Sequence, residues 1–236
     1  MLINFIQIPT EVDTAGVALG PDGQPISTET ISVLDLIIQG GWYIMVPLAI
    51  LSVMAIYIFI ERYFAIKKAS VVEKGLVDKI KDYIHSGRVS AAKDLCDNTN
   101  TPQSRMLGKG LTKIGKPLKD INAAVENVAK LEVYSLEKNL STLATIAGAA
   151  PMIGFLGTVI GMIVTFHEMK ISDKGVEIAE LSGGIMQAMV TTVAGLVIGI
   201  IAFVAYNSLV AYVDKVVNKL EESAIDFIDL LDEPGK

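Results

Sequence analysis

Long uncharged stretches dominate the pattern of hydrophobic and polar positions in this chain. Three of them, residues 36–60, 139–166 and 181–213, contain no Asp, Glu, Lys or Arg. A bilayer core is crossed by a helix of roughly 20 apolar residues, so each stretch is long enough to span it. The pattern therefore predicts an all-α integral membrane protein with three transmembrane helices.

The charges between these stretches predict how the chain lies across the membrane. Fifteen of the 20 basic residues lie between Arg62 and Lys138, against nine acidic residues in the same segment. Because basic loops stay on the cytoplasmic side, we expect this segment inside, the N-terminus outside and the C-terminus inside. The predicted order is a periplasmic N-terminal tail with a short interfacial helix (1–35), transmembrane helix 1 (36–60), a cytoplasmic helical domain (61–138), transmembrane helix 2 (139–166), a periplasmic loop (167–180), transmembrane helix 3 (181–213) and a cytoplasmic C-terminal helix (214–236).

Apolar positions at helical spacing continue beyond the last two spans. No Gly or Pro occurs between Leu118 and Gly148, which predicts one helix running from Leu118 into the second span. The third span likewise continues until Pro234 and Gly235 end it. Both helices should therefore project into the cytoplasm, by about 30 Å for 20 added residues. Shorter helices are expected at 72–87, 89–96 and 106–114.

The last two spans also carry stripes of small and hydroxyl residues. The members recur at spacings of three and four, which places them on one face of each helix: Ala144, Ala147, Pro151, Gly154, Thr158, Gly161 and Thr165 in the second span, and Gly184, Ala188, Thr192, Gly195, Gly199 and Ala202 in the third. Such faces let membrane helices approach closely. We expect close packing at Pro151, Gly154, Gly157, Gly161, Ala188, Gly195 and Gly199.

Two interpretations of the hydroxyls stay open. Each Thr could bond a carbonyl of its own helix and serve packing alone. Alternatively, Thr158 and Thr192, at similar depth in the two spans, line a polar path around a central element. The candidate pore-lining residues are Thr158, Thr192, Thr165, Thr191 and Gln187. Pro151 either frees a backbone carbonyl toward such a path or produces a packing kink.

The chemistry that the spans lack restricts the function. Ion paths through membranes normally contain charged or readily titrated groups, and these spans contain no Asp, Glu, His, Lys or Arg; Gln187 cannot titrate. If protons move here, the titrating carboxylate must come from a partner helix. The sequence has no Walker-type motif and no Cys or His cluster with metal-ligand spacing, so we expect no enzyme activity, cofactor or metal. Acids interleave with the basic residues, which favours a solvated cytoplasmic face over nucleic-acid binding.

Motifs in the last two spans are specific enough to suggest a family. The second span reads Leu143-x-x-Ile146-x4-Pro151-x-x-Gly154-x-x-Gly157-Thr158-Val159-x-Gly161-Met162. The third reads Gly184-Ile185-x-Gln187-Ala188-x-x-x-Thr192-x-x-Gly195-Leu196, followed by Val204-Ala205-Tyr206-Asn207. Together with Glu61-Arg62 at the cytoplasmic boundary of the first span, they resemble the ExbB/TolQ/MotA proton-channel family over roughly residues 40–215. Three spans favour ExbB and TolQ over MotA, which has four, and the external tail is more like that of ExbB.

The resemblance implies a homopentamer in the bacterial inner membrane, surrounded by lipid and enclosing copies of a single-span partner of the ExbD or TolR kind. The partner's membrane Asp would carry the protons, and Thr158 and Thr192 match the family's pore-facing threonines. The work would reach the outer membrane through a TonB- or TolA-like protein. The family often has Glu where this chain has Gln187, so the role of Gln187 stays open.

Other functions also remain as hypotheses. A TolQ-like subunit of an envelope system, a motility motor and a non-conducting membrane scaffold all fit the spans and the small-residue faces. A secondary transporter is disfavoured, because the chain shows no paired repeat and no broken helices around a midplane site.

Overall fold

The computed structural model describes residues 41–70, 75–171 and 178–232. The predicted N-terminal tail and interfacial helix lie outside the described residues, as do residues 172–177 of the predicted periplasmic loop. The helices are α2 (Trp42–Ala69), α3 (Leu76–His85), α4 (Val89–Thr99), α5 (Pro102–Leu111), α6 (Leu118–Glu137), α7 (Leu140–Ile171) and α8 (Ile178–Asp232). Among the described residues there is no strand, so the prediction of an all-α chain is confirmed for them.

Three helical stretches are long and apolar enough to cross a membrane. They are Trp42–Ala69, Leu118–Ile171 and Leu181–Asp232, and each contains one of the uncharged stretches or most of it. The second includes the junction between α6 and α7. The predicted number of spans therefore agrees with the structure.

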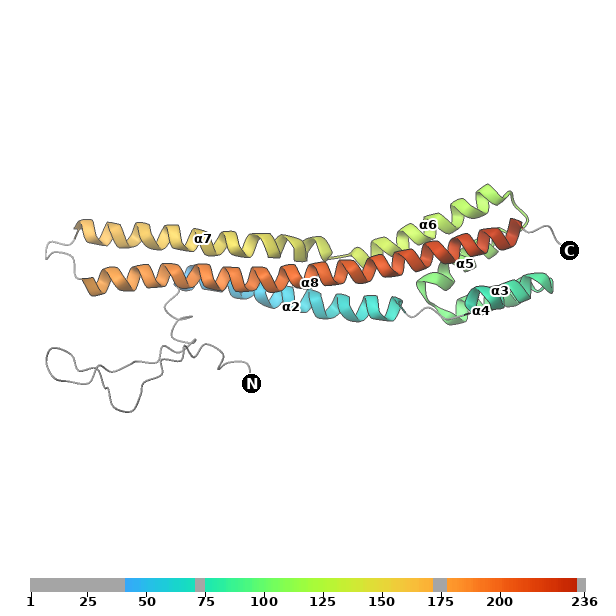
Figure 1. The fold of residues 1–236 in the computed structure, drawn as a ribbon, viewed down its shortest axis with the longest axis horizontal. Coiled ribbons are helices and arrows are strands. Elements are labelled where there is room, and N and C mark those ends of the chain that lie inside the picture. Colours follow the sequence, from blue (N-terminus) through green and yellow to red (C-terminus); the bar gives the residue numbers. More distant parts are fainter. Residues whose placement is uncertain (1–40, 71–74, 172–177, 233–236) are drawn as a thin grey trace, which may run out of the picture.

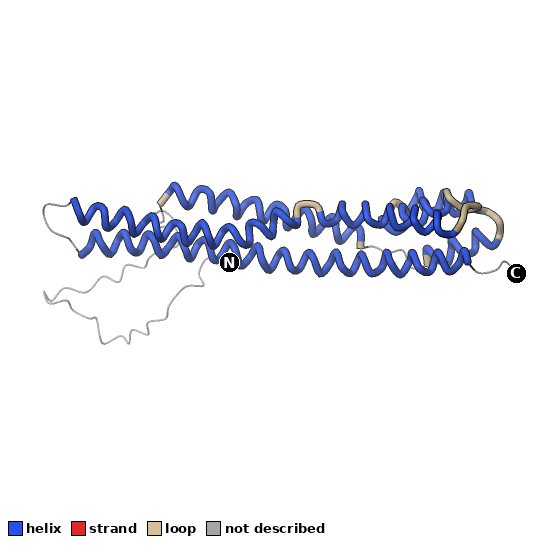
Figure 2. Tube along the Cα trace, turned by 90° about the horizontal axis from the view of Figure 1, so that it is seen from above, coloured by secondary structure: helices blue, strands red, loops and turns tan. Residues whose placement is uncertain are grey.

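The helices form one elongated bundle (Figures 1 and 2). α7 lies beside α8 along its length, and α2 packs against the same part of α8 (Figure 1). The 55 residues of α8 correspond to about 80 Å at 1.5 Å per residue. This one helix therefore reaches from the end where α7 finishes to the opposite end, where α3–α6 gather.

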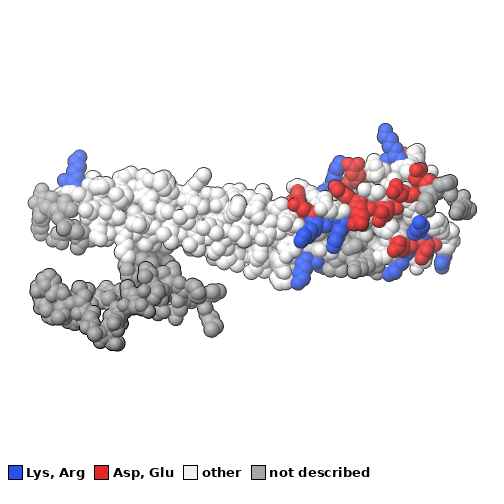
Figure 3. All heavy atoms as spheres, in the orientation of Figure 1, with Lys and Arg blue, Asp and Glu red and all other residues white. Residues whose placement is uncertain are grey.

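Charged side chains divide the bundle into two parts. They gather over α3–α6 and the last part of α8, which we call the charged half (Figure 3). The part formed by residues 42–60 of α2, α7 and the first part of α8 is nearly free of them in this view, apart from a basic side chain at the far end. We call this part the apolar half. Its exposed surface is rich in large hydrophobic side chains, such as Val53 and Ile56 of α2 and Phe155 of α7, as a lipid-facing or protein-facing membrane surface requires.

Local sequence explains the ends of the short helices in the charged half. Asn100 follows α4 with a left-handed φ of 46°, a conformation that Asn tolerates better than most residues. The Thr101 hydroxyl then accepts a hydrogen bond from Ser104 N (3.2 Å), and Ser104 Oγ accepts one from Thr101 N (2.9 Å). This capping box starts α5 at Pro102. The predicted helix at 106–114 was therefore placed too far along the chain.

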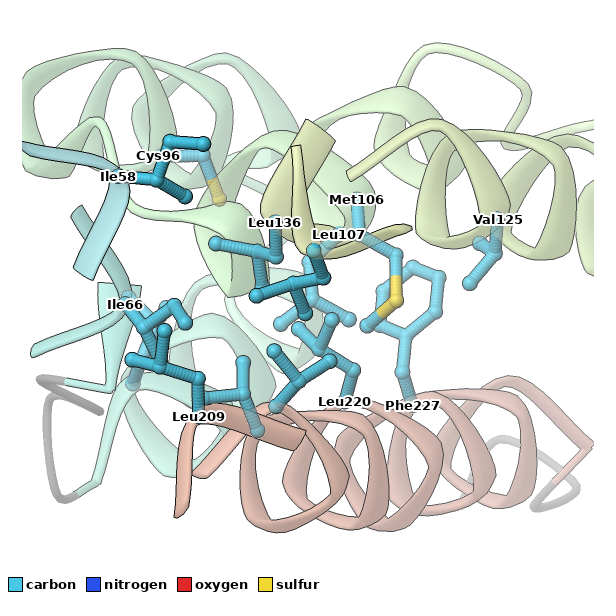
Figure 4. Packing of buried hydrophobic residues seen from close by; sticks show 14 of the residues in the cluster. Ile58, Ile66, Cys96, Met106, Leu107, Val125, Leu136, Leu209, Leu220 and Phe227 are labelled. Carbon is cyan, nitrogen blue, oxygen red and sulfur yellow. The ribbon is translucent and has the colours of Figure 1, made fainter. Parts of the chain in front are cut away.

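A buried apolar cluster holds the charged half together (Figure 4). Met106 of α5, Val125 of α6 and Phe227 of α8 are completely buried, and Leu220 is nearly so. Gly110 of α5 leaves room for the Phe227 ring, because a Cβ atom at this position would lie 2.5 Å from Phe227 Cε1. The end of α8 is thus fixed by packing against α5 and α6.

The predicted uninterrupted helix from Leu118 into the second span is wrong. α6 ends at Glu137 and α7 begins at Leu140. Between them, Lys138 has an extended ψ of 135° and Asn139 a left-handed φ of 65°. No Gly or Pro stands at this point, and the sequence signal for a break is only the enrichment of Asn at left-handed φ. Arg62 of α2 donates a hydrogen bond to Ser135 O beside the break (3.1 Å). α8 runs without a break to Asp232, as predicted.

Candidate functional site

The backbones of α7 and α8 meet at two glycines in the apolar half. A Cβ atom on Gly154 would lie 2.8 Å from Thr191 O. A Cβ atom on Gly195 would lie 2.6 Å from Ala150 O and 2.9 Å from the Gly154 Cα. Real Cβ atoms essentially never come within 3.0 Å of such neighbours. Glycine at both positions therefore lets the two helices approach to backbone contact.

Other small residues of the predicted faces lie along the same contact. A Cβ atom on Gly157 would meet the Thr191 hydroxyl oxygen at 2.5 Å, and one on Gly161 would meet the Ala188 Cβ at 3.0 Å. The structure thus brings Gly154, Gly157, Gly161, Ala188 and Gly195 together in one contact. We call this contact, with the threonines that border it, the α7–α8 seam.

Pro151 packs against α8 in this seam. Its ring has no N–H, so the Ala147 carbonyl, four residues earlier, loses its helical donor. A Cβ atom on Gly199 would lie 2.5 Å from the Pro151 Cγ and 3.1 Å from Ala147 O. The unpaired carbonyl and the ring therefore both lie against Gly199 of the neighbouring helix.

The Gly154 carbonyl lies within hydrogen-bond distance of two hydroxyls of α8, although Thr191 has one proton and its shorter contact is to Ala188 O. Thr192 Oγ1 donates to Gly154 O at 3.1 Å. Thr191 Oγ1 lies 2.7 Å from Ala188 O and 3.3 Å from Gly154 O. Thr191 is buried and Thr192 is partly buried. One carbonyl and two hydroxyls thus lie together between uncharged stretches of the two helices.

Thr158 and Thr165 bond within their own helix. Thr158 Oγ1 donates to Phe155 O (2.6 Å), and Thr165 Oγ1 donates to Gly161 O (2.9 Å). Thr165 is buried against Gly184, whereas Thr158 is partly exposed. The structure therefore brings Thr191 and Thr192 together on one acceptor and leaves Thr158 and Thr165 apart from it.

Gln187 of α8 contacts the residue that precedes the first span. Its side chain is partly buried, and a Cβ atom on Gly41, the residue before α2, would lie 2.7 Å from Gln187 Nε2. Gly41 has a φ of 77° and therefore suits glycine in any case. Gln187 thus joins α8 to α2 in this structure.

Glu61 and Arg62 lie at the opposite end of α2, against the junction of α6 and α7. Arg62 is buried, with 8% of its surface exposed. Its Nη1 donates to Ser135 O of α6 at 3.1 Å, and its Nη2 forms an ion pair with the Glu61 carboxylate. The Asn139 side chain lies close enough to interact with the Glu61 carboxylate. The pair expected at the membrane boundary therefore contacts both sides of the helix break.

Shifted titratable groups occur in the charged half, away from the seam. Burial, together with the nearby Asp97 charge, raises the pKa of the Cys96 thiol to about 11. A hydrogen bond from Arg105 to the Glu132 carboxylate raises the pKa of the Arg105 guanidinium. Among the described residues no group of three or more His, Cys, Asp or Glu side chains is placed to hold a metal ion. The seam itself offers hydroxyls and carbonyls, which can pass a proton along or orient water but cannot store charge.

Sequence reasoning missed several partners in these contacts. The Gly154 acceptor is a backbone carbonyl, which every residue has, so no residue type in the sequence indicates it. Ser135 accepts through its backbone, so its side chain gives no signal either. Asn139 had a weak signal, because Asn is enriched at left-handed φ among residues other than glycine.

Comparison with known proteins identifies the family. The profile of the MotA/TolQ/ExbB proton channel family matches residues 98–222, more than half of the chain. The chain belongs to this family. The match runs from the end of α4 through α5, α6 and α7 to residue 222 of α8, and it includes the whole of the α7–α8 seam.

Individual relatives carry related names. The chain is 27% identical over 170 residues to the "Putative biopolymer transport protein ExbB-like 3" of Synechocystis, a match that covers 72% of this chain and 81% of the relative. It is 29% identical over 195 residues to the "Putative biopolymer transport protein ExbB homolog" of Methanothermobacter thermautotrophicus, covering 80% and 67%. It is also 36% identical over 98 residues to the "Tol-Pal system protein TolQ" of Haemophilus influenzae, covering 42% and 41%.

Proposed function

We propose that this chain is the ring-forming subunit of an ExbB–ExbD type proton channel, which uses the proton motive force to energise TonB-dependent transport across the outer membrane. Membership of the MotA/TolQ/ExbB family supports the proton channel. The names of the longer matches favour an ExbB-like subunit.

The α7–α8 seam is the observation on which the assignment rests. It places the Gly154 carbonyl, Thr191 and Thr192 within stretches of α7 and α8 that contain no Asp, Glu, His, Lys or Arg. Such a seam can guide protons but cannot take them up by titration. In the proposal the titrating carboxylate is a membrane Asp of an ExbD-like single-span partner, enclosed by five copies of this chain. Thr158, Thr165 and Gln187 belong to the same proposed path.

The proposed setting is the bacterial inner membrane. The basic segment would place the charged half in the cytoplasm, the N-terminus in the periplasm and the C-terminus in the cytoplasm. One proton crossing 100 mV releases about 2.3 kcal/mol. Several protons must therefore be coupled before a TonB-like protein can perform substantial work at the outer membrane.

A TolQ-like role in a Tol-Pal envelope system is the second candidate. The identity to a TolQ protein over the matched segment supports it. Because the seam motifs serve either system, the two roles differ in the partner that the chain selects. Co-purification with ExbD-like and TolR-like single-span proteins expressed in competition would separate them.

Replacing the threonines tests the channel. We expect Thr158→Val with Thr192→Val to leave assembly intact, since valine has nearly the shape of threonine, and to lower partner-dependent proton flux into liposomes by about tenfold or more, equal to roughly 1.4 kcal/mol on the barrier. Thr145→Val is the matched control, because Thr145 donates to Ser141 O on an exposed face of α7. Full flux in the double variant would contradict the assignment and favour a non-conducting scaffold.

Assembly is tested by native mass spectrometry of the chain with and without a co-expressed single-span neighbour. The proposal requires a closed pentamer that retains fewer copies of the neighbour than of itself. A monomer or dimer that ignores the neighbour would contradict it.

A further inference from the structure

The α6–α7 junction is a break that its own sequence does not require. From Leu118 to Ala147 the chain contains no Gly or Pro, and such a segment favours one continuous helix. Instead, Asn139 adopts a left-handed φ of 65°, which residues with a side chain rarely adopt. Asn is enriched at this φ among residues other than glycine, and contacts from outside the segment also meet the break.

Arg62 supplies one of the outside contacts. The last four carbonyls of a helix have no intrahelical donor, and Ser135 O is among those of α6. Arg62 Nη1 donates to this carbonyl at 3.1 Å from a residue 73 positions away. A cation at a helix C-terminus is also favoured by the helix dipole. In a continuous helix, Ser135 O would instead accept from the Asn139 amide.

Glu61 supplies the second contact. Its carboxylate pairs with Arg62 and interacts with the nearby Asn139 side chain. Two neighbouring residues of α2 thus bind both the last turn of α6 and the left-handed residue before α7. Arg62 Nε is buried without a partner among the described residues. A buried guanidinium with an unpaired N–H is unusual. Burying Arg62 in this way costs free energy, so its contacts with α6 and Glu61 require an explanation beyond the stability of α2.

We propose that Glu61 and Arg62 form a clasp that holds the α6–α7 junction broken and so positions the charged half relative to the α7–α8 seam. Without the clasp, α6 and α7 join as one helix. The clasp and the break can be tested without any partner protein. Their consequence for proton-driven work rests on the proposed function. In that setting, a shift of α2 would change the direction in which α6 leaves the membrane boundary.

Amide hydrogen exchange of the full chain in liposomes measures the state of the junction. The first intrahelical bond of α7 runs from Leu143 N to Asn139 O (3.2 Å), so the amides of residues 139–142 lack helical acceptors and should exchange quickly. We expect Arg62→Met to slow their exchange by about tenfold or more, because they gain acceptors in a continuous helix. Loss of a merely structural contact would instead fray the helix ends and speed exchange.

Substitutions at Asn139 make the test independent of Arg62. Asn139→Ala disfavours the left-handed φ and should also slow exchange, even if Arg62→Met fails to fold. Asn139→Gly accepts that φ at no steric cost and, added to Arg62→Met, should restore the fast exchange. Unchanged or faster exchange in both Arg62→Met and Asn139→Ala would overturn the clasp.

Proton flux through the same variants separates the clasp from the proposed function. We expect reduced partner-dependent flux in Arg62→Met and Asn139→Ala, with recovery when Asn139→Gly is added to Arg62→Met. Unchanged flux through a continuous junction would overturn the positioning role. Absence of flux in the unsubstituted complex would count against the proposed function, while the exchange results would still decide the clasp.

Discussion

The contact between Gly195 and the backbone of α7 predicts a sharp cost for a single methyl group. In Gly195→Ala the new Cβ would lie 2.6 Å from Ala150 O and 2.9 Å from the Gly154 Cα, and no real Cβ sits so close. Because the neighbours are backbone atoms, a side-chain rotation cannot relieve the overlap, and the helices must separate. Overpacking of this kind costs about 1–3 kcal/mol.

The matched control is Gly148→Ala in α7. A Cβ atom on Gly148 has nothing within 4 Å, so this variant reports only the helix propensity gained by replacing Gly with Ala, about 1 kcal/mol. Both variants share that gain, so the difference between their unfolding free energies isolates the overpacking. We expect a difference of about 2 kcal/mol.

Thermal unfolding in mild detergent, followed by circular dichroism, measures this difference. For a chain of this size, 2 kcal/mol corresponds to a difference in Tm of roughly 4–8 °C, with Gly195→Ala the less stable. Equal Tm values for Gly195→Ala and Gly148→Ala would refute the backbone contact between α7 and α8. The separation of the helices should also break the bond from Thr192 to the Gly154 carbonyl.

Two further predictions concern the charged half. Burial raises the pKa of Cys96 from an ordinary value near 9 to about 11. The unfolded chain therefore releases this proton at lower pH than the folded chain, and the free energy of unfolding should fall as pH rises from 9 to 11. Urea unfolding measured across this pH range should show the fall, and Cys96→Ala should remove it. Glu132→Gln should lower the free energy of unfolding by about 0.5–1 kcal/mol, because it leaves partly exposed Arg105 of α5 without its carboxylate partner on α6. An unchanged midpoint of urea unfolding would show that the ion pair contributes nothing to stability.

The sequence predicted the parts of this fold that local pattern controls. The uncharged stretches predicted the three helices that are long and apolar enough to cross a membrane. The unbroken apolar pattern predicted the long α8. The spacing of Gly154, Gly157 and Gly195 placed them on faces that do meet in the seam. Such features follow from helix geometry, which fixes which residues share a face.

Features that depend on distant contacts were not predictable in the same way. At the α6–α7 break, Ser135 O accepts a hydrogen bond from Arg62, 73 residues earlier in the chain, and no pattern of neighbouring residues predicts such a contact. The spacing also could not show which hydroxyl would cross between helices. Thr192 bonds the Gly154 carbonyl while Thr158 bonds its own helix, a difference set by the rotation of α7 and α8 against each other.

Proton flux into liposomes tests the central claim most directly. The chain is reconstituted alone, with an ExbD-like partner, and with the same partner carrying Asn in place of its membrane Asp. Because the spans of this chain contain no Asp, Glu, His, Lys or Arg, the account predicts flux only with the unsubstituted partner. Equal flux through the chain alone, or through the complex with the Asn-substituted partner, would contradict it.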